Sequence, residues 1–585
     1  MSRCRFRMFS TRYGLLAALL VLAAYCAQPS VYGQTATATL SGTVEDQNGA
    51  IVPGATVFAV NTATTLQRQS TTTSSGVYTI PLLPPGTYVV RVEAQGFTTL
   101  EIRDVVLNVA DQKALLIQLN PGGVSATVDV KSEAPLINES PAVATTVDRE
   151  FVANLPLNGR SFQSLITLSP GIVLTKATGA NPGQFSVNGQ RPDSNYFTVD
   201  GVSANFGVTP DAVVGQTGAG SIPGLSVSGG TNNLVSVDAL QEFKVLTSTY
   251  APEYGRMPGG QISIVTRSGT NSLHGTIFDY LRNDALDAND WFANVNQLKK
   301  PALRQNDFGG VVGGPLFLPR FGEGGRAVYS GRNKTFFFFS YEGLRLRQPL
   351  TAISQVPSLA SRQNAIASIR PFLNAFPLPN GANTSAGMAF FSASYSNPTR
   401  LDATSIRLDH TVNSKLSLFG RYNYAPSDTT PRGLNGGVLS QVSPTIVKTR
   451  TLTLGGIYSI SPRVINDMRA NWSSNRGREI NGLDGFGGAI PISDEQYFPS
   501  TFIGERNFTF SLTSATYQKG GFANNVQTQF NFTDGLSIAA GNHQWKFGAD
   551  FRRATIEFRP LRINGQAVFQ GAAGALNGLV LRGVI

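Results

Sequence analysis

Apolar and polar residues alternate at every second position in many stretches of the second half of the chain. In 415–424, leucine, glycine and tyrosine alternate with lysine, serine, arginine and asparagine, and only Phe419 departs from the pattern. The stretches 467–473 and 544–552 show the same alternation. Successive side chains of a β-strand point to opposite faces, so the pattern predicts strands with one apolar and one polar face. The stretch 274–283 is the first of about ten to twelve such candidates.

The links between these strands alternate in length. Short turns at 413–414, 461–462 and 541–543 alternate with long links at 425–447 and 474–525. Short periplasmic turns and long extracellular loops are typical of bacterial outer-membrane barrels, in which one strand face contacts lipid and the other faces the lumen. A soluble β-sandwich protein would share the alternation but not the difference in loop length. We therefore predict a transmembrane antiparallel barrel.

The predicted barrel occupies residues 269–585. Aromatic side chains suited to a membrane–water interface support it: Trp472, Trp545, Tyr422 and Tyr424. A charged side chain facing lipid costs up to about 2–4 kcal/mol at mid-membrane, so the arginines of these strands are predicted to face the lumen. The candidates are fewer than the about 22 strands of a large plugged barrel, and 581–585 is not an aromatic closing strand. We expect a partial barrel and a sequence that is a fragment or truncated product.

The first half of the chain has a different organisation. Residues 38–120 contain short apolar runs separated by turn signals such as Gln47-Asn48-Gly49 and Pro84-Pro85-Gly86, which predicts a β-sandwich. The runs lie at 39–44, 56–60, 77–80, 88–94 and 114–119. Residues 121–144 are predicted as a linker. Residues 145–268 mix β signals, many glycines and one helix at 148–154, which predicts an α+β domain.

The first 33 residues have the features of a secretory signal peptide. The apolar run 15–24 follows four arginines and precedes small residues before Gln34, and it is short for a membrane anchor, the alternative reading. Both cysteines, Cys4 and Cys26, lie in this segment, so the exported chain is predicted to contain no disulfide and no thiol chemistry.

Charge and motif content argue against several classes of function. Removing the four leader arginines reduces the formal charge from +11 to 11 − 4 = +7, without a basic cluster typical of nucleic-acid binding. The three histidines, His274, His410 and His543, are far apart, and no phosphate-binding loop or nucleophile elbow occurs. We therefore predict no catalytic residue, no metal site, no cofactor, no nucleic-acid partner and no enzymatic activity.

Residues 41–61 (SGTVEDQNGAIVPGATVFAVN) and 74–97 (SSGVYTIPLLPPGTYVVRVEAQGF) resemble the carboxypeptidase regulatory-like domain. The resemblance implies a carbohydrate-binding-like fold, although a fold does not fix a function. A structural spacer and a sugar-binding site both remain open for this domain.

Further motifs follow in order: LPLNGR at 155–160, VNGQR at 187–191, NYFTVDG at 195–201, YGR at 254–256, GG at 259–260, ISIVT at 262–266, NDFGGVVGGP at 306–315 and NKTFFFFSYEG at 333–343. In this order they resemble the TonB-dependent outer-membrane transporters, in particular the Oar-like subfamily, from about Ser41 to the end. The resemblance implies that 145–268 is a plug domain. Its motif residues are Asn158, Gly159, Arg160, Asn188, Gly189, Arg191, Asp200, Gly201, Tyr254, Gly255, Gly259 and Gly260.

The resemblance also implies a function and its partners. A TonB-type energy-transducing protein of the inner membrane would pair with a TonB box and displace the plug, so that a bulky or scarce solute crosses the outer membrane. The solute would be a carbohydrate, a metal chelate or a peptide, the barrel would contact outer-membrane lipid, and the N-terminal domains would be periplasmic. The alternative is a barrel-anchored structural or adhesion protein whose sandwich or loops bind glycans or proteins.

The same resemblance assigns roles to individual residues. Thr127, Val128, Asp129 and Val130 are the best candidate for the TonB box, with a plain linker strand as the alternative. Arg160, Arg191 and Asp200 are candidate polar contacts between plug and barrel, or ordinary solvated and turn-stabilising residues. Gly255, Gly259 and Gly260 are expected to serve backbone geometry, because glycine tolerates positive φ and close approach.

Overall fold

The computed structural model describes residues 36–584 with internal gaps. Residues outside the described part are 1–35, 123–126, 132–136, 139–141, 155–162, 168, 175–184, 209–219, 228, 320–327, 385–386, 434–436, 497–505, 513, 542, 559–562, 577–579 and 585. The predicted leader and the motif residues Asn158, Gly159 and Arg160 therefore lie outside the described residues.

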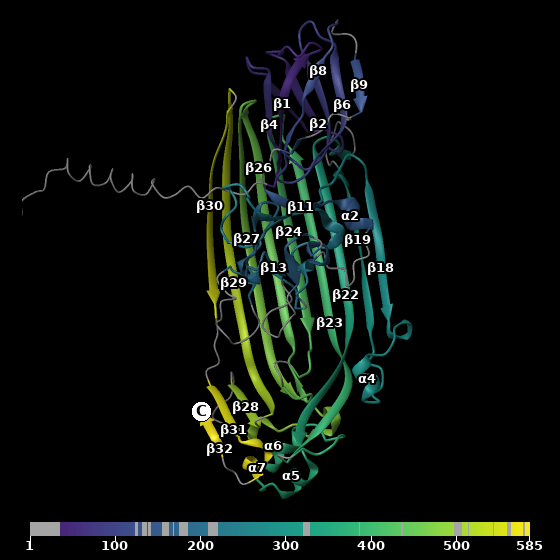
Figure 1. The fold of residues 1–585 in the computed structure, drawn as a ribbon, viewed down its shortest axis with the longest axis vertical. Coiled ribbons are helices and arrows are strands. Elements are labelled where there is room, and N and C mark those ends of the chain that lie inside the picture. Colours follow the sequence, from purple (N-terminus) through teal and green to yellow (C-terminus); the bar gives the residue numbers. More distant parts are fainter. Residues whose placement is uncertain are drawn as a thin grey trace, which may run out of the picture.

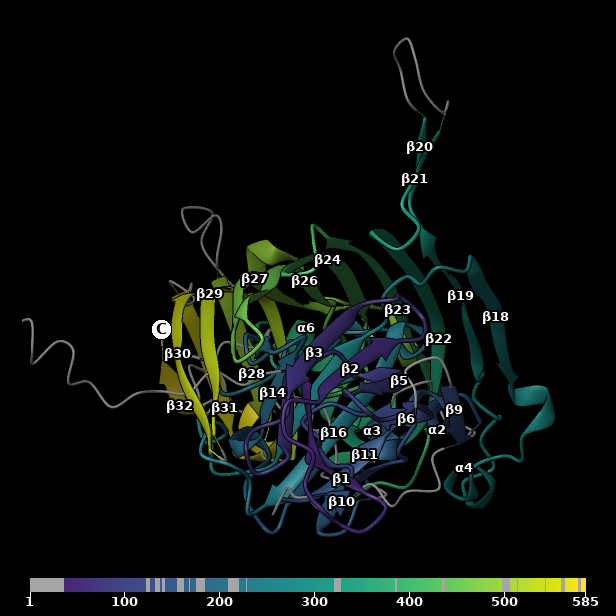
Figure 2. The same cartoon turned by 90° about the horizontal axis from the view of Figure 1, so that it is seen from above.

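The described chain forms a sandwich, a plug and a curved wall of long strands (Figure 1). The sandwich lies at one end of the wall, and the plug lies on the concave side of the wall, as the view along the long axis shows (Figure 2). No helix among the described residues is long and apolar enough to span a membrane. The fold is mainly β, as the alternation of apolar and polar residues predicts.

The sandwich consists of two sheets packed on one apolar core. Its strands are β1 (Ala38–Asp46), β2 (Thr56–Asn61), β3 (Gln67–Thr71), β4 (Val77–Leu83), β5 (Gly86–Glu93), β6 (Thr99–Leu107), β7 (Gln112–Ala114), β8 (Ile117–Leu119), β9 (Thr127–Lys131) and β10 (Ile137–Asn138). One sheet has the order β10-β7-β1-β4, with β8 also on β1, and the other has the order β3-β2-β5-β6-β9. Leu40, Tyr88 and Val90 are completely buried between them.

Three details of the sandwich differ from the sequence prediction. The predicted linker 121–144 is partly strand, because β9 pairs with β6 and β10 pairs with β7 of the sandwich. The predicted strand 114–119 is two short strands, because β1 pairs with β7 at Thr39–Ser41 and with β8 only from Val44 onward. Strands β3 and β6 were not predicted. Strand β3 reads QRQST and has no apolar face, so its period-two burial follows from pairing with β2 and not from its own composition.

The plug is built around a five-stranded sheet of order β11-β16-β17-β14-β15. Its elements are β11 (Val143–Val147), α2 (Arg149–Asn154), α3 (Gln163–Ile166), β12 (Ile172–Leu174), β13 (Phe185–Val187), η2 (Pro192–Ser194), β14 (Tyr196–Val199), β15 (Val202–Ser203), η3 (Thr231–Asn233), η4 (Val237–Ala239), β16 (Leu240–Ser248) and β17 (Gln261–Thr266). Helix α2 begins as predicted, because the Asp148 carboxylate accepts a hydrogen bond from the Phe151 N–H at 2.9 Å.

The wall continues directly from the plug. Its long strands pair one after another: β18 (His274–Asn283), β19 (Arg304–Pro315), β22 (Thr335–Pro357), β23 (Met388–Thr411), β24 (Leu416–Thr429), β26 (Thr445–Ser461), β27 (Val464–Leu483), β29 (Ala515–Ala540) and β30 (His543–Glu557). Among the described residues β18 and β30 each pair on one side only, so the wall is open. The alternation predicted for 415–424 is confirmed: Leu418 and Tyr422 are exposed on the convex face, whereas Arg421 and Asn423 are buried on the lumen side.

Short elements cover the end of the wall farthest from the sandwich (Figure 1). They are η5 (Asp284–Leu286), α4 (Trp291–Val295), α5 (Leu359–Asn364), α6 (Arg370–Asn374), β25 (Gln441–Val442), η7 (Phe486–Gly488), η8 (Asp494–Gln496), β28 (Arg506–Leu512), β31 (Ile563–Phe569), α7 (Gly571–Leu576) and β32 (Val580–Val584). Strands β25, β28, β31 and β32 join the wall, so its sheet has 13 strands in the described part, against the ten to twelve predicted after Leu273. The predicted long links are therefore partly strand. At the opposite end, β20 (Phe317–Pro319) and β21 (Val328–Ser330) form a separate hairpin.

Candidate functional site

A network of ion pairs between plug and wall is centred on a tight turn of the plug. Strands β14 and β15 pair Thr198 with Ser203 and Val199 with Val202, which leaves Asp200 and Gly201 as a two-residue turn. Their φ angles are 50° and 78°, as a type I′ turn requires at both central positions. A side chain at Gly201 would also collide with the Arg469 guanidinium, because a Cβ there would lie 1.7 Å from Nη1. The Asp-Gly sequence therefore places a carboxylate directly against the wall.

Three arginines of the wall converge on Asp200. Arg407 of β23 contacts the carboxylate with Nη1 at 3.1 Å from Oδ1, and Arg421 of β24 lies with Nη1 at 4.0 Å from Oδ2. Arg469 of β27 donates a hydrogen bond to the Asp200 backbone carbonyl at 2.6 Å. Thr266, at the end of β17, also donates to the carboxylate through its N–H and its hydroxyl, both at 3.0 Å from Oδ1.

Two aspartates of the wall complete the network. Asp409 pairs with Arg407 at 2.8 Å, and Asp467 pairs with Arg469 at 2.6 Å. Counting Asp200, three arginines face three aspartates, so the formal charge of the group is 3 − 3 = 0. Ion pairs removed from water are tolerated when each charge is matched and hydrogen-bonded. The arrangement can therefore hold the plug turn firmly and can also separate into two hydrated surfaces.

Further plug–wall contacts extend along β15 and the chain beyond it. The Ser203 N–H donates to the Asn531 side-chain oxygen at 2.8 Å, and Gln529 donates back to the Ser203 carbonyl at 2.9 Å. Arg552 donates to the Asn205 carbonyl at 2.6 Å. Arg256 pairs with Asp550 at 3.0 Å. These contacts are polar, whereas the apolar core of the plug extends to Val311 and Phe338 of the wall.

The sandwich contacts the other side of the plug through strand β16. The Lys244 ammonium lies 3.1 Å from the Asp111 carboxylate and also donates to the Ala110 carbonyl at 3.2 Å. The Glu242 carboxyl accepts a hydrogen bond from the Val109 N–H. The pKa of Glu242 is raised to about 8, chiefly by burial and also by the nearby Asp111 and Asp148, although the Val109 N–H and Lys244 act in the opposite direction. This junction therefore contains a carboxyl group that titrates near neutral pH.

The sandwich also contacts the rim of the wall. Arg68 donates to the Ser459 hydroxyl and to the Ser414 carbonyl, and burial lowers the pKa of its guanidinium. The Thr65 hydroxyl donates to the Asn333 side chain at 3.1 Å. These partners belong to or adjoin the turns between wall strands, so the sandwich marks the end of the wall at which the predicted short turns occur.

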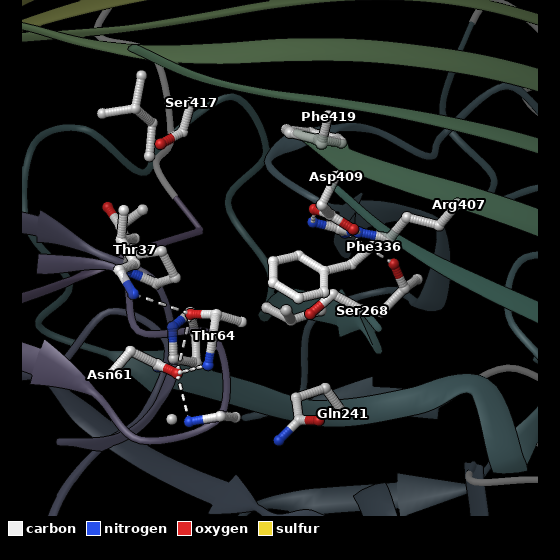
Figure 3. A pocket seen from close by; sticks show the side chains of 18 of the residues that line it. Thr37, Asn61, Thr64, Gln241, Ser268, Phe336, Arg407, Asp409, Ser417 and Phe419 are labelled. Atoms are coloured by element: carbon white, nitrogen blue, oxygen red, sulfur yellow. Dashed lines mark hydrogen bonds and ion pairs between the residues drawn. The ribbon is translucent and has the colours of Figure 1, made fainter. Parts of the chain in front are cut away.

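A cavity of about 360 Å³ lies where the three parts meet. Figure 3 shows Thr37, Asn61 and Thr64 of the sandwich on one side and Phe336, Arg407 and Phe419 of the wall on the other. The Arg407 guanidinium lies over the Phe419 ring at 4.6 Å from its centroid. Phe419, the exception in the alternating pattern, faces the lumen, where its ring forms a cation–π contact with an arginine of the network.

The predicted TonB-box residues lie at the edge of the sandwich. Thr127, Val128, Asp129 and Val130 belong to strand β9, which pairs in parallel with β6 from Thr99 to Arg103. Strand β9 is the last strand of its sheet in the described part of the chain. The segment is thus extended, as predicted, and it is paired on one side.

The remaining plug-motif residues occupy turns. Asn188 and Gly189 form a second turn with positive φ at both positions, and the Asn188 amide donates to the Thr247 carbonyl at 3.0 Å. Arg191 is exposed and forms no ion pair among the described residues, which agrees with the reading of a solvated side chain. The structure therefore brings Asp200, but not Arg191, to the wall.

The closing motif of the plug contains three glycines and a buried tyrosine. Gly259 and Gly260 pack so closely that a Cβ would lie 2.6 Å from the Ser194 carbonyl oxygen and 2.8 Å from Val187, respectively. Gly255 has a φ of 156° and open space around it. Tyr254 is buried, and burial raises the pKa of its phenol.

Several functional residues were not singled out from the sequence. Arg421, Arg469 and Asp467 were recognised only as lumen-facing. For Asp467 and Arg469 the signal is the pairing of opposite charges two positions apart on one strand face, as it is for Arg407 and Asp409, whereas Arg421 has only Phe419 and Asn423 at those positions. Glu242 and Lys244 carry the same signal, because they are opposite charges two positions apart on β16. Among the described residues, no cluster of three or more His, Cys, Asp or Glu side chains is arranged to hold a metal ion.

Three family models match the chain in succession. The carboxypeptidase regulatory-like domain matches residues 39–120, the TonB-dependent receptor plug domain matches 137–261, and the outer membrane beta barrel domain matches 265–372 and 364–579. The barrel matches together cover more than half of the chain.

Individual proteins are similar over smaller shares. The TonB-dependent transporter Oar of Myxococcus xanthus is 30% identical over 311 residues, which are 49% of this chain and 26% of that protein. The outer-membrane transporter YddB of Escherichia coli is 14% identical, with a TM-score of 0.46 over 74% of this chain and 50% of that one. A mutant of the ferric enterobactin receptor PfeA of Pseudomonas aeruginosa is 13% identical, with a TM-score of 0.45 over 72% and 50%. The chain thus matches about a quarter of the curated relative and about half of these solved chains.

Proposed function

The chain belongs to the TonB-dependent receptors of the bacterial outer membrane, and from this premise we propose that it moves a bulky or scarce solute across that membrane. In this proposal an inner-membrane energy-transducing partner displaces the plug and opens a path along the wall. The solute belongs to the metal chelates, carbohydrates or peptides. No catalytic step is part of the process.

The observation that carries the proposal is the ionic network at Asp200. The apolar core of the plug includes two wall residues, Val311 and Phe338, whereas the contacts at Asp200 and Ser203 are made by charged and amide groups that water can solvate after separation. A purely anchoring barrel would gain nothing from a separable plug. We therefore assign Asp200, with Arg407 and Arg469, to the closed-state contact that must break during transport.

The partner is proposed to bind at strand β9. Its outer edge is unpaired among the described residues, so a strand of the partner can add to it by backbone hydrogen bonding. From β9 the chain leads through β10 to β11, which pairs with β16 of the plug sheet. A pull on β9 would act first on its pairing with β6 and on the pairing of β10 with β7, and after these separate it would act on β11 at the edge of the plug sheet. The alternative role of β9 as a plain structural strand remains the competing assignment for Thr127 to Val130.

The test of this function measures binding of the full receptor to the periplasmic domain of the energy-transducing partner. Val128→Pro removes a backbone N–H from the predicted box and should abolish binding. Val143→Pro places a proline at an exposed residue of the nearby strand β11 and serves as the matched control. The Val143→Pro receptor should still bind the partner domain. Unchanged binding of the Val128→Pro receptor would refute the box assignment, and no binding by the unmodified receptor would favour the anchoring or adhesion function.

A further inference from the structure

The hairpin β20–β21 projects from the wall at the sandwich end. Figure 2, viewed along the long axis, shows it extending outward, away from both the plug and the sandwich. Within the part of the chain that the structure describes, the two strands pair only with each other, with Phe317 opposite Ser330, Leu318 opposite Tyr329 and Pro319 opposite Val328. The neighbouring links at this end, 412–415 and 462–463, are much shorter. The hairpin is therefore an addition to the plain rim of the wall.

The described residues of the hairpin are largely apolar and exposed. Phe317, Leu318 and Val328 are 49%, 48% and 49% exposed. Paired residues of antiparallel strands share a face, so Leu318 and Tyr329 lie on one face and Phe317 and Val328 lie on the other. A two-stranded hairpin is at best marginally stable alone in water. Apolar groups on both faces indicate surroundings that are themselves apolar.

The base of the hairpin lies beside the lipid-facing surface of the wall. The Gly331 N–H donates to the Leu316 carbonyl at 2.8 Å, which closes the base. Exposed apolar residues of the wall reach the same end, with Leu273 at 69%, Val412 at 42% and Ile460 at 49% exposure. The apolar surface of the hairpin thus continues the surface that contacts lipid.

Basic side chains lie in successive turns at this end of the wall. Arg332 and Lys334 adjoin the base of the hairpin, and Lys415 and Arg463 lie in the two neighbouring turns; all four are exposed. The turns 331–334, 412–415 and 461–463 contain no acidic residue. A row of cations beside an apolar surface is complementary to the phosphates and acyl chains of a phospholipid leaflet.

We propose that β20–β21 is a membrane-surface anchor that lies along the phospholipid leaflet facing the periplasm. Phe317, Leu318 and Val328 lie at the boundary of headgroups and acyl chains, and Arg332 and Lys334 contact headgroup phosphates. The anchor fixes the rim at the point where the sandwich docks, because Asn333 of the same turn binds Thr65. This role depends on the barrel being in the outer membrane and not on the transport of any solute.

The test places a spin label on the hairpin of the full receptor in nanodiscs of phosphatidylethanolamine and phosphatidylglycerol. The cysteines of these 585 residues lie in the predicted leader, so Val328→Cys and the control Leu116→Cys, on an exposed residue of the sandwich, introduce single label sites. The ratio of oxygen to water-soluble nickel-complex accessibility should be about ten-fold higher at residue 328 than at residue 116. Equal ratios would place the hairpin in water and overturn the proposal. Protection from both reagents would place it against protein and would also overturn it.

A second variant tests the basic residues. The double substitution Arg332→Glu and Lys334→Glu should lower the accessibility ratio at residue 328 in nanodiscs that contain phosphatidylglycerol. Lys299→Glu, on an exposed residue near the opposite end of the wall, is the matched control and should leave the ratio unchanged. An unchanged ratio in the double variant would overturn the assignment of Arg332 and Lys334 to headgroup phosphates.

Discussion

The plug is held at two junctions of different chemistry. On the wall side, Asp200 meets arginines from three strands, and every charge of that group has an opposite partner. On the sandwich side, a single buried pair, Lys244 with Asp111, lies beside the protonatable Glu242. The junction with the wall contains more ion pairs, and the stability of the junction with the sandwich depends on pH. The comparison indicates that the sandwich can detach from the plug more easily than the plug can detach from the wall.

The largest effect is expected from Asp200→Asn. The substitution leaves three arginines facing two aspartates in a buried site, and an uncompensated buried charge costs about 3–5 kcal/mol. Hydrogen exchange should become faster in β14 and β15, while exchange in the sandwich strands should not change. Asp287→Asn, at an exposed pair with Arg282 at 4.0 Å, is the matched control and should have no effect. Equal exchange in both variants would show that the network does not hold the plug.

A smaller effect is expected from Lys244→Met at the sandwich junction. Asp111 loses this partner but keeps Lys113 at 3.2 Å, so the loss should be about 1–3 kcal/mol. Exchange should increase in β16 and in the segment 107–112 and should remain unchanged in β14. A double-mutant cycle with Asp111→Asn isolates the pair. If the coupling energy in that cycle is zero, Lys244 and Asp111 do not hold the sandwich.

The pH dependence of the sandwich junction follows from Glu242. Its pKa is raised from its usual 4.5 to about 8, so the closed junction retains a proton that the free carboxyl would release. The contribution to stability is fully present below about 4.5 and is lost as pH rises through about 8, at up to about 1.4 kcal/mol per pH unit. Limited proteolysis of the sandwich–plug linker should therefore become faster toward alkaline pH, after correction for protease activity. The Glu242→Gln receptor should lose this dependence; if it keeps the dependence, another group is responsible.

The smallest effect is expected at the rim of the wall. The hydrogen bond from Thr65 to Asn333 is exposed to solvent, so Thr65→Ala should change the stability of the sandwich junction by less than about 1 kcal/mol. Thermal unfolding followed by the fluorescence of a sandwich label would measure it. A loss as large as that of Lys244→Met would mean that the rim, and not β16, is the main attachment of the sandwich.

The sequence predicted those parts of the fold in which pattern and burial agree. Strand β18 begins and ends where predicted, and the two faces of 467–473 separate as the alternation requires, with Met468 exposed and Arg469 buried. Strand β3 was missed because its polar sequence forms a strand only through its partner. Local pattern cannot reveal an element whose stability comes from a distant strand.

The candidate site was only partly predictable for the same reason. The Asp200-Gly201 pair indicates a turn, and the alternation predicts lumen-facing arginines. The contact between Asp200 and these arginines, however, joins residues more than 200 positions apart. This contact depends on the curvature of the wall and on the position of the plug within it. Glu242 shows the same limit, because its raised pKa depends on Val109 and Asp111 of another domain.

The central claim, that the Asp200 junction separates when the partner acts, is tested most directly by labelling residue 203 in living cells. Ser203 is 2% exposed and contacts Asn531 of the wall, so a cysteine there is shielded while the junction is closed. Ser203→Cys receptors should react with a small maleimide in energised cells and should be protected when an uncoupler collapses the proton gradient or the partner is deleted. Leu116→Cys should react in every condition. If Ser203→Cys reacts at the same rate with and without the gradient, the junction does not open in response to the partner and the account is contradicted.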